Sequence, residues 1–463
     1  MSTNALDDLL ASVGSFMPEA TPQNLIITAI VTALPLLALL GLAISQRDRR
    51  LPPPAGCRKI GLKGKSNLED QYSKKYAGQI GEPGKAKPWT VKALFVYPIK
   101  SCAPVELDRS DVIRTGMKYD REFCFGQYVT GLPTLEGKVH SEWQFMTLRK
   151  FPRLATVETE IWVPDPSAQN YHEDGEWVKS EGCVVLRFPF SPDTDFTLEG
   201  LRNFGKVMAA RLAGKPEPVV EFRIPFNPPK ERVESKGYTS DVLRIWRDNP
   251  LAFNVGSEIE PDILAKLRYT LGAANPISLF RINPEKRRQV FKNAPKKADV
   301  GFQTVIGMQD SYPMHVVNLA SVHDVANKLS EKQNAKFTQA FQTSYVLHNA
   351  LRYRANIYVT GPKAFEEDSW TKAKIGSTEY HFSCRTTRCK LPNVDPETGV
   401  ADPNEPSTTL RSYRIIDPGS KNPVLGMQIT PLEEGEVKVG DSVEALETGE
   451  HIFDGGEGDK VIG

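Results

Sequence analysis

The chain has 463 residues, of which 40% are hydrophobic and 25% are charged, a composition typical of a globular protein with room for two domains. Its 58 lysines and arginines nearly balance its 57 aspartates and glutamates, giving a formal net charge of +1, so nothing global favours a nucleic-acid partner and any anion site must be local. Six cysteines in so long a chain exclude a small disulfide-dense secreted scaffold and indicate a reducing compartment.

An uncharged apolar run follows a short N-terminal tail. Residues 25–44 read LIITAIVTALPLLALLGLAI, which is the length that a helix needs to cross a hydrocarbon core. A cleaved signal peptide would have a basic start and a shorter apolar region, whereas this chain carries Asp7 and Asp8 ahead of the run. We therefore expect a tail at 1–23 and a transmembrane anchor at 24–45.

Basic residues follow the apolar run, beginning with QRDRR at 46–50, and the N-terminal tail carries no lysine or arginine. This asymmetry places the large C-terminal part of a single-pass protein in the cytosol. Residues 46–89 are rich in Pro, Gly and Lys and show little periodicity, so we expect a linker there rather than a packed element.

Strand-like patterns dominate from Trp89 onward, for example VKALFVYPIK at 91–100 and CVVLRFPF at 183–190. Helical spacing appears at Ile259, Ile263, Leu267 and Leu271 and again in SVHDVANKLSEK from Ser321, after which strand patterns return. The predicted fold class is mainly β with peripheral helices (α+β), built from β-barrels.

Two cysteines lie close together in HFSCRTTRCKLPNVDPETG at 381–399. A zinc site would need a second ligand pair, which is missing, and a redox dithiol is usually Cys-x-x-Cys. A disulfide does not suit a reducing compartment. Cys384 has the character of a small buried hydrophobe in a strand. Cys389 is flanked by Arg385 and Arg388, and nearby positive charge favours the thiolate that metals and electrophiles need.

RCKLPNVDPETG resembles the signature of MOSC domains, which are named from the C-terminal part of molybdenum-cofactor sulfurase. RYRANIYV at 352–359 and FEEDSW at 365–370 lie upstream, and TLRSYR at 409–414 and GEVKVGDSV at 435–443 lie downstream, in the order of that family. VYPIKSCAPVEL at 96–107, YDREF at 119–123 and MTLRKFPRL at 146–154 resemble the β-barrel that precedes MOSC in the mitochondrial amidoxime-reducing component family. The resemblance implies an N-terminal MOSC barrel domain at 90–250, a MOSC domain at 251–448 and a tail at 449–463.

The chain departs from this family at three places. Cys384 is shifted two residues earlier than the usual position, Ala355 replaces a common proline, and LGMQ at 425–428 replaces a usual Phe-Gly-x-Tyr. These departures concern the rim of the site, and the Arg388-Cys389 pair is intact.

The resemblance implies that Cys389 is the protein ligand to molybdenum, held by a pterin dithiolene in the molybdenum cofactor (Mo-molybdopterin). A soft thiolate suits such a centre. Lys100, Ser101 and Arg121 would hold the cofactor phosphate. Further cofactor-binding positions implied by the resemblance are Thr147, Ser321, Arg354, Asn356 and Arg388.

Asp395 would lie near the metal as a catalytic residue, although Asp-Pro-x-Thr-Gly is also an ordinary turn sequence, and we favour the turn. Ser321 could equally be a helix N-cap, and Asn356 could be a turn residue. Glu367, Asp368 and Trp370 are expected to be structural.

The implied activity is reduction of N-hydroxylated compounds, amidoximes and hydroxylamines, by a molybdenum-dependent oxidoreductase. The chain carries neither a dinucleotide fingerprint nor a Cys-x-x-Cys-His haem motif, so electrons must come from partners. The family implies cytochrome b5 and NADH-cytochrome b5 reductase on the mitochondrial outer membrane, with no nucleic-acid partner. Three alternatives stay open. They are a molybdenum-cofactor carrier, a MOSC-type sulfur-transfer protein without reductase turnover, and a membrane-tethered structural protein with a degenerate site, which the departures at Ala355 and 425–428 allow.

Overall fold

The computed structural model describes residues 21–45, 51–77, 89–133, 135–168, 170–334 and 348–453. Most of the predicted N-terminal tail at 1–23, and the C-terminal tail beyond residue 453, lie outside the described residues. The chain divides into two compact units, one formed by 1–51 with 189–219 and the other by 52–188 with 220–463. Each is considered by itself.

The smaller unit contains two described helices, α2 (Pro22–Ser45) and α4 (Leu198–Leu212). A helix thus forms where the anchor is predicted at 24–45. Within the described ranges, however, no helix combines the length and the apolar character that crossing a bilayer requires. The predicted transmembrane anchor is therefore not supported.

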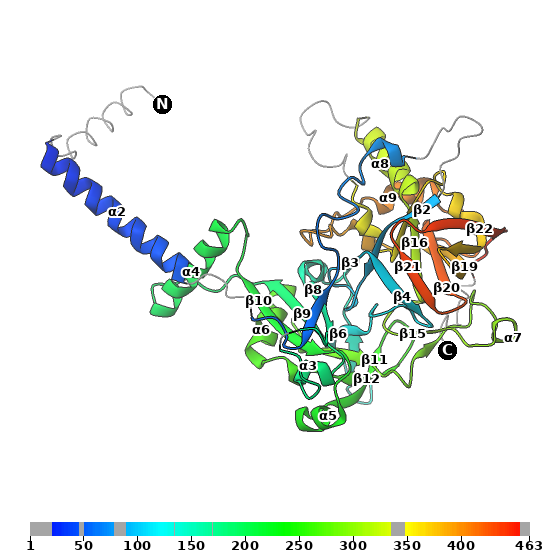
Figure 1. Cartoon of the computed structure of the whole chain (residues 1–463), viewed down its shortest axis with the longest axis horizontal. Coiled ribbons are helices and arrows are strands. Elements are labelled where there is room, and N and C mark those ends of the chain that lie inside the picture. Colours follow the sequence, from blue (N-terminus) through cyan, green and yellow to red (C-terminus); the bar gives the residue numbers. More distant parts are fainter. Residues whose placement is uncertain are drawn as a thin grey trace. The chain divides into compact units, whose positions relative to one another are not determined.

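The larger unit is mainly β, with two closed arrangements of strands (Figure 1). In the first barrel the pairing order is β11 (Thr239–Arg244), β12 (Leu251–Asn254), β13 (Ile277–Ile282), β6 (Phe123–Thr130) and β7 (Ser141–Phe145). The parallel pairing of Leu243 with Trp143 closes it. Its interior is filled by apolar side chains that include Phe280 and Ile282, as alternation in these strands predicts.

The second barrel contains the strands nearest the C-terminus. Its order is β17 (Ile357–Thr360), β16 (Met314–Asn318), β20 (Val424–Pro431), β19 (Thr378–Thr387), β18 (Trp370–Ile375), β22 (Ser442–Thr448), β2 (Trp89–Val96) and β3 (Val105–Leu107). A pairing of β17 with β2 closes the ring. Three of its strands are aligned at one level, because His315 of β16 and Cys384 of β19 both pair with Gln428 of β20.

Smaller sheets and helices complete the unit. The sheets are β1 (Cys57–Ile60), β8 (Glu158–Pro164), β9 (Cys183–Pro189) and β10 (Val219–Pro225); β21 (Gly435–Lys438), β4 (Arg109–Ile113) and β5 (Gly116–Met117); and β14 (Arg288–Gln289) with β15 (Val305–Ile306). The helices are α3 (Glu176–Lys179), α5 (Lys230–Lys236), α6 (Pro261–Leu271), α7 (Lys297–Val300), α8 (Leu319–Asn334) and α9 (Ser407–Tyr413). The helical spacings found from Ile259 and from Ser321 thus correspond to α6 and α8. The predicted fold class, mainly β with peripheral helices, is confirmed.

The predicted linker at 46–89 is wrong for its central part. β1 pairs antiparallel with β8, and Leu68 and Gln71 are buried, with Gln71 Oε1 accepting from the backbone N–H of Ala350 at 2.7 Å. Pro and Gly in this stretch shape turns between packed residues, so their frequency alone did not indicate a free tether.

The strands also cross the predicted boundary at residue 250. β2 belongs to the range 90–250 but pairs with β17 and β22, while β12 and β13 from the range 251–448 complete the first barrel. Strand pairing follows backbone hydrogen bonding and shared cores rather than order along the chain. The two barrels therefore exchange strands.

Candidate functional site

A cavity of about 200 Å³ in the larger unit gathers most of the predicted site residues. Its lining comes from the loop after β2, the segments after β5 and β7, the loop before β16, and the end of β19. The predicted residues that line it are Lys100, Ser101, Arg121, Thr147, Arg354, Asn356, Arg388 and Cys389. Residues almost 290 positions apart thus meet at one place.

Cys389 offers the accessible thiol of this cavity. It follows the end of β19, its side chain is exposed, and its sulfur accepts from the backbone N–H of Leu391 at 3.4 Å. Cys384 also lines the cavity but is only 1% exposed, and burial raises the pKa of its thiol to about 12. The thiolate is the form that binds metals, so Cys384 is poorly placed to be a ligand, and the prediction that it is a buried small residue is confirmed.

Arg388 fixes the turn that carries Cys389. Its buried guanidinium donates to the carbonyl oxygens of Leu425, at 2.6 Å from Nη2 and 2.9 Å from Nε, and of Tyr353, at 3.2 Å. Nη2 also lies 2.6 Å from Nε2 of His315. Burial, then Arg388 and Arg121, keep the pKa of His315 well below its usual value, so a neutral ring accepts this hydrogen bond. Arg388 is therefore a positioning residue in this structure.

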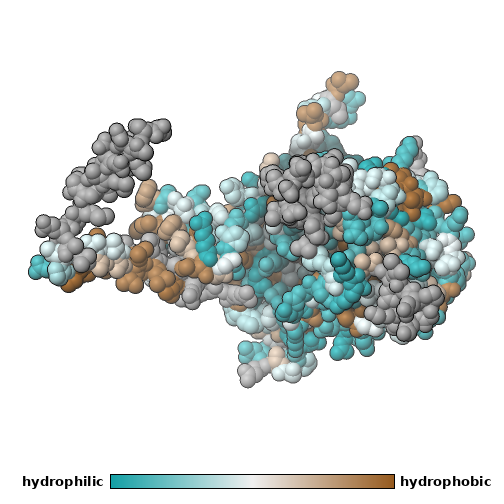
Figure 2. All heavy atoms as spheres, turned by 90° about the horizontal axis from the view of Figure 1, so that it is seen from above, coloured by the Kyte–Doolittle hydropathy of each residue, from teal (hydrophilic) through white to brown (hydrophobic). Residues whose placement is uncertain are grey.

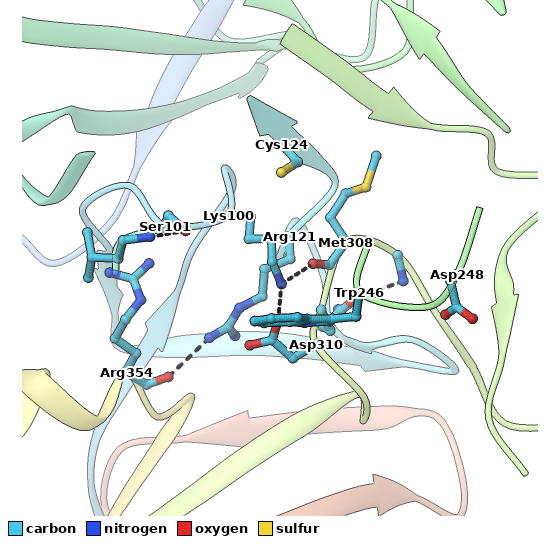
Figure 3. A network of polar contacts seen from close by, with 12 residues as sticks. Lys100, Ser101, Arg121, Cys124, Trp246, Asp248, Met308, Asp310 and Arg354 are labelled. Carbon is cyan, nitrogen blue, oxygen red and sulfur yellow. Dashed lines mark hydrogen bonds and ion pairs between the residues drawn. The ribbon is translucent and has the colours of Figure 1, made fainter. Parts of the chain in front are cut away.

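The ammonium of Lys100 also lines the cavity and is already paired (Figure 3). Its Nζ donates to the carbonyl oxygen of Met308 at 2.8 Å and to Oδ1 of Asp310 at 2.6 Å. Burial lowers the pKa of Lys100, opposed by Asp310. Desolvation at the cavity wall likewise opposes ionisation of Asp310, although its side chain is 55% exposed, and Lys100 holds its pKa below the usual range. The Nε1–H of Trp246 also donates to this carboxylate, at 2.9 Å.

Two more arginines place positive charge beside Lys100. The guanidinium groups of Arg121 and Arg354 lie 4.4 and 4.2 Å from the ring centroid of Tyr97, in cation–π contact. Nη1 of Arg121 donates to Oδ2 of Asp120 at 2.7 Å and to Oδ1 of Asn356 at 3.1 Å. Asn356 is fully buried and its Oδ1 also accepts the backbone N–H of His315, so at the cavity lining it ties β16 to the residue before β17.

Backbone strain concentrates at this cavity. Ser101, Arg121 and Arg354 have φ of 72°, 51° and 52°, and Trp246 has φ of 55°. Residues with side chains rarely adopt this left-handed conformation, and such strain clusters at functional sites.

Asp395 and Ser321 do not lie with the other predicted residues. Asp395 lines a different cavity, its Oδ2 accepts from Arg352 at 2.8 Å, and its Oδ1 accepts the backbone N–H groups of Glu397 and Thr398, both at 3.0 Å. These contacts are those of the ordinary turn that we favour for Asp395 over a catalytic role. Ser321 is buried and donates to Oε1 of Glu367 at 2.7 Å. Its hydroxyl therefore ties α8 to the segment before β18. The structure thus does not place Asp395 or Ser321 in the cavity that holds the other predicted site residues.

Among the lining residues that the sequence did not predict are Arg149, Trp246 and Asp310. Arg149 lies two positions after Thr147 in a motif already quoted, and its guanidinium is 4.7 Å from the ring centroid of Trp246. Asp310 lies in the loop before β16, outside the motifs given above. Arg149 could have been found by reading its motif to the end, whereas Asp310 could not. Trp246 lies in the turn between β11 and β12, where no pattern indicates a site.

Comparisons with known proteins agree with this arrangement. The MOSC N-terminal beta barrel domain matches residues 89–206, and the MOSC domain matches residues 303–444. Mitochondrial amidoxime reducing component 2 of Bos taurus is 32% identical over 363 residues, covering 76% of this chain and 82% of that protein. The chain belongs to the mitochondrial amidoxime-reducing component family.

Other members and a related protein give the breadth of this similarity. Mitochondrial amidoxime-reducing component 1 of Mus musculus is 32% identical over 366 residues, which are 77% of this chain and 82% of that protein. Molybdenum cofactor sulfurase of Homo sapiens is 22% identical over 327 residues, 71% of this chain but 29% of that longer protein.

The cavity has the chemistry that the molybdenum cofactor of this family would need. Within the described parts of the chain, three buried polar atoms of the lining have no hydrogen-bond partner, namely Oγ1 of Thr147, Oγ1 of Thr386 and Nε of Arg385. Buried polar groups are nearly always paired, so a polar group bound here would complete them. With the Cys389 thiol and the nearby cations, the residues fit an anionic pterin with a soft metal.

Proposed function

We propose that this protein is a molybdenum-cofactor oxidoreductase that reduces N-hydroxylated compounds, amidoximes and hydroxylamines. The observation that carries the proposal is the pairing, in one cavity, of a single exposed thiol with buried polar atoms that lack partners. A binding surface for an apolar ligand would not retain those atoms, because each costs free energy while unpaired.

Cys389 would hold the metal through its thiolate, and Arg388 would keep that thiolate at the cavity mouth. Lys100, with Ser101 and Arg121 beside it, would bind the phosphate end, where charge-assisted hydrogen bonds are strongest. Thr147 would donate or accept at the pterin. Bound there, the cofactor would supply the two-electron chemistry that converts N–OH and two protons into N–H and water.

Tight binding of an anion at Lys100 requires Asp310 to give way. The carboxylate accepts from Lys100 and Trp246, and a phosphate would compete for the same ammonium hydrogens. Because the Asp310 side chain is 55% exposed, it can move into water at small cost. We therefore assign it as a carboxylate that occupies the phosphate position until the anion arrives.

The electrons would come from cytochrome b5 and NADH-cytochrome b5 reductase, since the sequence has no motif for a nicotinamide, flavin or haem group of its own. The relatives' names support a mitochondrial location. Fractionation of cells with an antibody to the chain tests it, and recovery away from mitochondria would contradict it.

The test of the function is to purify the full chain from a host that makes the cofactor. Molybdenum and pterin content are measured first, and NADH-dependent reduction of benzamidoxime with the two partners second. Stoichiometric cofactor with turnover is expected. Cofactor without turnover would favour the carrier alternative. A chain that contains no cofactor and shows no turnover would contradict the proposal. A persulfide on Cys389, formed with a cysteine desulfurase, would favour sulfur transfer and overturn the reductase assignment.

A further inference from the structure

Helix α4 carries an apolar stripe that faces solvent. At helical spacing Leu198, Leu201, Phe204, Met208 and Leu212 lie within about one third of the helix circumference. Leu198 is 80% exposed and Leu212 63% exposed, and Leu201 and Phe204 are also exposed. Phe196, just before the helix, is fully exposed. Large apolar side chains gain free energy when they leave water, so water is an unfavourable surrounding for this face.

The helix is well defined locally, so the exposed stripe is not a frayed end. Thr197 is the N-cap, and its Oγ1 accepts the backbone N–H of Gly200 at 3.0 Å. Asp195 in turn accepts from the backbone N–H of Thr197 at 3.1 Å. Such a cap stabilises the first turn of the helix.

Basic residues border the stripe on both sides. Arg202 lies along one edge and Arg211 along the other, with Lys206 beyond Arg202. All three are exposed, and none forms an ion pair with a carboxylate among the described residues. An apolar stripe flanked by unpaired cations is the pattern of a helix that lies in the plane of an anionic lipid surface.

The same compact unit adds more apolar surface. α2 lies against α4 in this unit, and its described apolar side chains, among them Ile26, Val31 and Leu37, are exposed. Figure 2 shows hydrophobic residues gathered over these helices. An exposed apolar patch of this extent marks an interaction site, and the flanking cations favour anionic lipid headgroups over a protein groove.

We propose that α4 is an interfacial membrane-binding helix, which inserts Leu201, Phe204 and Leu212 among the acyl chains of anionic lipids. Arg202, Lys206 and Arg211 would contact the headgroups. This assignment concerns a helix lying on the surface and requires no span of the bilayer. It is also independent of the chemistry at Cys389.

The test places a tryptophan in the stripe. Phe204→Trp in the full chain is mixed with vesicles of phosphatidylcholine containing 30% phosphatidylserine, with acyl chains brominated to quench fluorescence. Tyr269→Trp is the matched control, because Tyr269 is an exposed aromatic residue on helix α6. Quenching above that of the unmodified chain is expected for Phe204→Trp alone.

Two further measurements keep the result decisive. Leu201→Glu with Leu212→Glu, in the Phe204→Trp chain, should lower the vesicle partition coefficient at least 10-fold while far-UV circular dichroism stays unchanged. High salt should weaken binding to the anionic vesicles. Equal quenching for the two tryptophan variants, or none beyond the unmodified chain, would overturn the proposal and leave a protein partner or a second copy as the occupant of this face.

Discussion

Nζ of Lys100 lies 2.6 Å from Oδ1 of Asp310, so the cation assigned to the cofactor phosphate is held by a carboxylate of the same chain. Asp310→Asn should therefore tighten binding of inorganic phosphate to the cofactor-free chain by roughly 5-fold, the effect of removing a partly screened competitor worth about 1 kcal/mol. Isothermal titration calorimetry measures it. Lys100→Ala is the control and should abolish the binding; an unchanged or weaker affinity in Asp310→Asn would contradict the assignment.

Thr147 and Thr159 form a matched pair for testing the cavity. Both hydroxyl groups are buried, but Oγ1 of Thr147 has no partner within the described structure, whereas Oγ1 of Thr159 donates to the carbonyl of Ala103 at 3.0 Å. Thr147→Val should leave the cofactor-free chain equally stable or up to about 1 kcal/mol more stable, while Thr159→Val should destabilise it by about 1–2 kcal/mol.

Denaturant unfolding measures the free energies of unfolding of the two threonine variants. The pterin content of each purified variant is measured as well. Thr147→Val should lower bound pterin, and Thr159→Val should not when the protein is folded. Equal destabilisation by the two substitutions would mean that Thr147 is paired within the protein and is not a cofactor contact.

His315 makes stability depend on pH in a defined direction. Its folded-state pKa lies well below the usual value of 6.5, so the folded state binds fewer protons than the unfolded state below pH 6.5. Its contribution is therefore complete above that pH and is lost as the pH falls. The slope for one such histidine is about 1.4 kcal/mol per pH unit.

The measurement is the free energy of unfolding between pH 7.5 and 5, in the unmodified chain and in His315→Gln. Three other histidines with lowered pKa values, His348, His381 and His451, keep a residual slope in the variant. The variant should be less steep by about the amount of one histidine. Identical slopes would show that His315 titrates normally.

The two cysteines at the end of β19 should differ in reactivity. Of the six cysteines only Cys389 is exposed, so a thiol reagent added to the folded, cofactor-free chain at pH 7.5 should modify one thiol per chain rapidly. Cys389→Ser should abolish that phase, and Cys384→Ser should keep it, because burial raises the pKa of Cys384 and denies access. Rapid modification of two thiols would contradict the buried placement of Cys384.

Much of this site could be predicted from short motifs because each motif holds residues in one local geometry. The resemblance points to the Arg388-Cys389 pair, and the burial of Cys384 follows from its place in β19, where Tyr380 and Phe382 are buried on the same alternation. Lys100, Arg121 and Thr147 each lie in a turn at a strand end, which is where barrels present functional groups.

Other features depend on tertiary contacts that no local pattern contains. Ser321 has the sequence of a cap or site residue, but α8 turns its hydroxyl toward Glu367, a carboxyl whose pKa burial raises to about 7. Asp395 satisfies its own turn and Arg352. β1 and the exchange of β2 between barrels could not be predicted because strand partners far along the chain are chosen by shared cores.

The central claim is that Cys389 makes this cavity a molybdenum-dependent reductase site. The most direct measurement is NADH-dependent reduction of benzamidoxime, with cytochrome b5 and its reductase, by the unmodified chain, Cys389→Ser and Cys384→Ser at equal folded concentration. Cys389→Ser should lower kcat at least 1,000-fold, since the metal loses its protein ligand, and Cys384→Ser should retain most activity. Turnover that survives in Cys389→Ser, or equal loss in both variants with cofactor retained, would contradict ligation by this single thiolate.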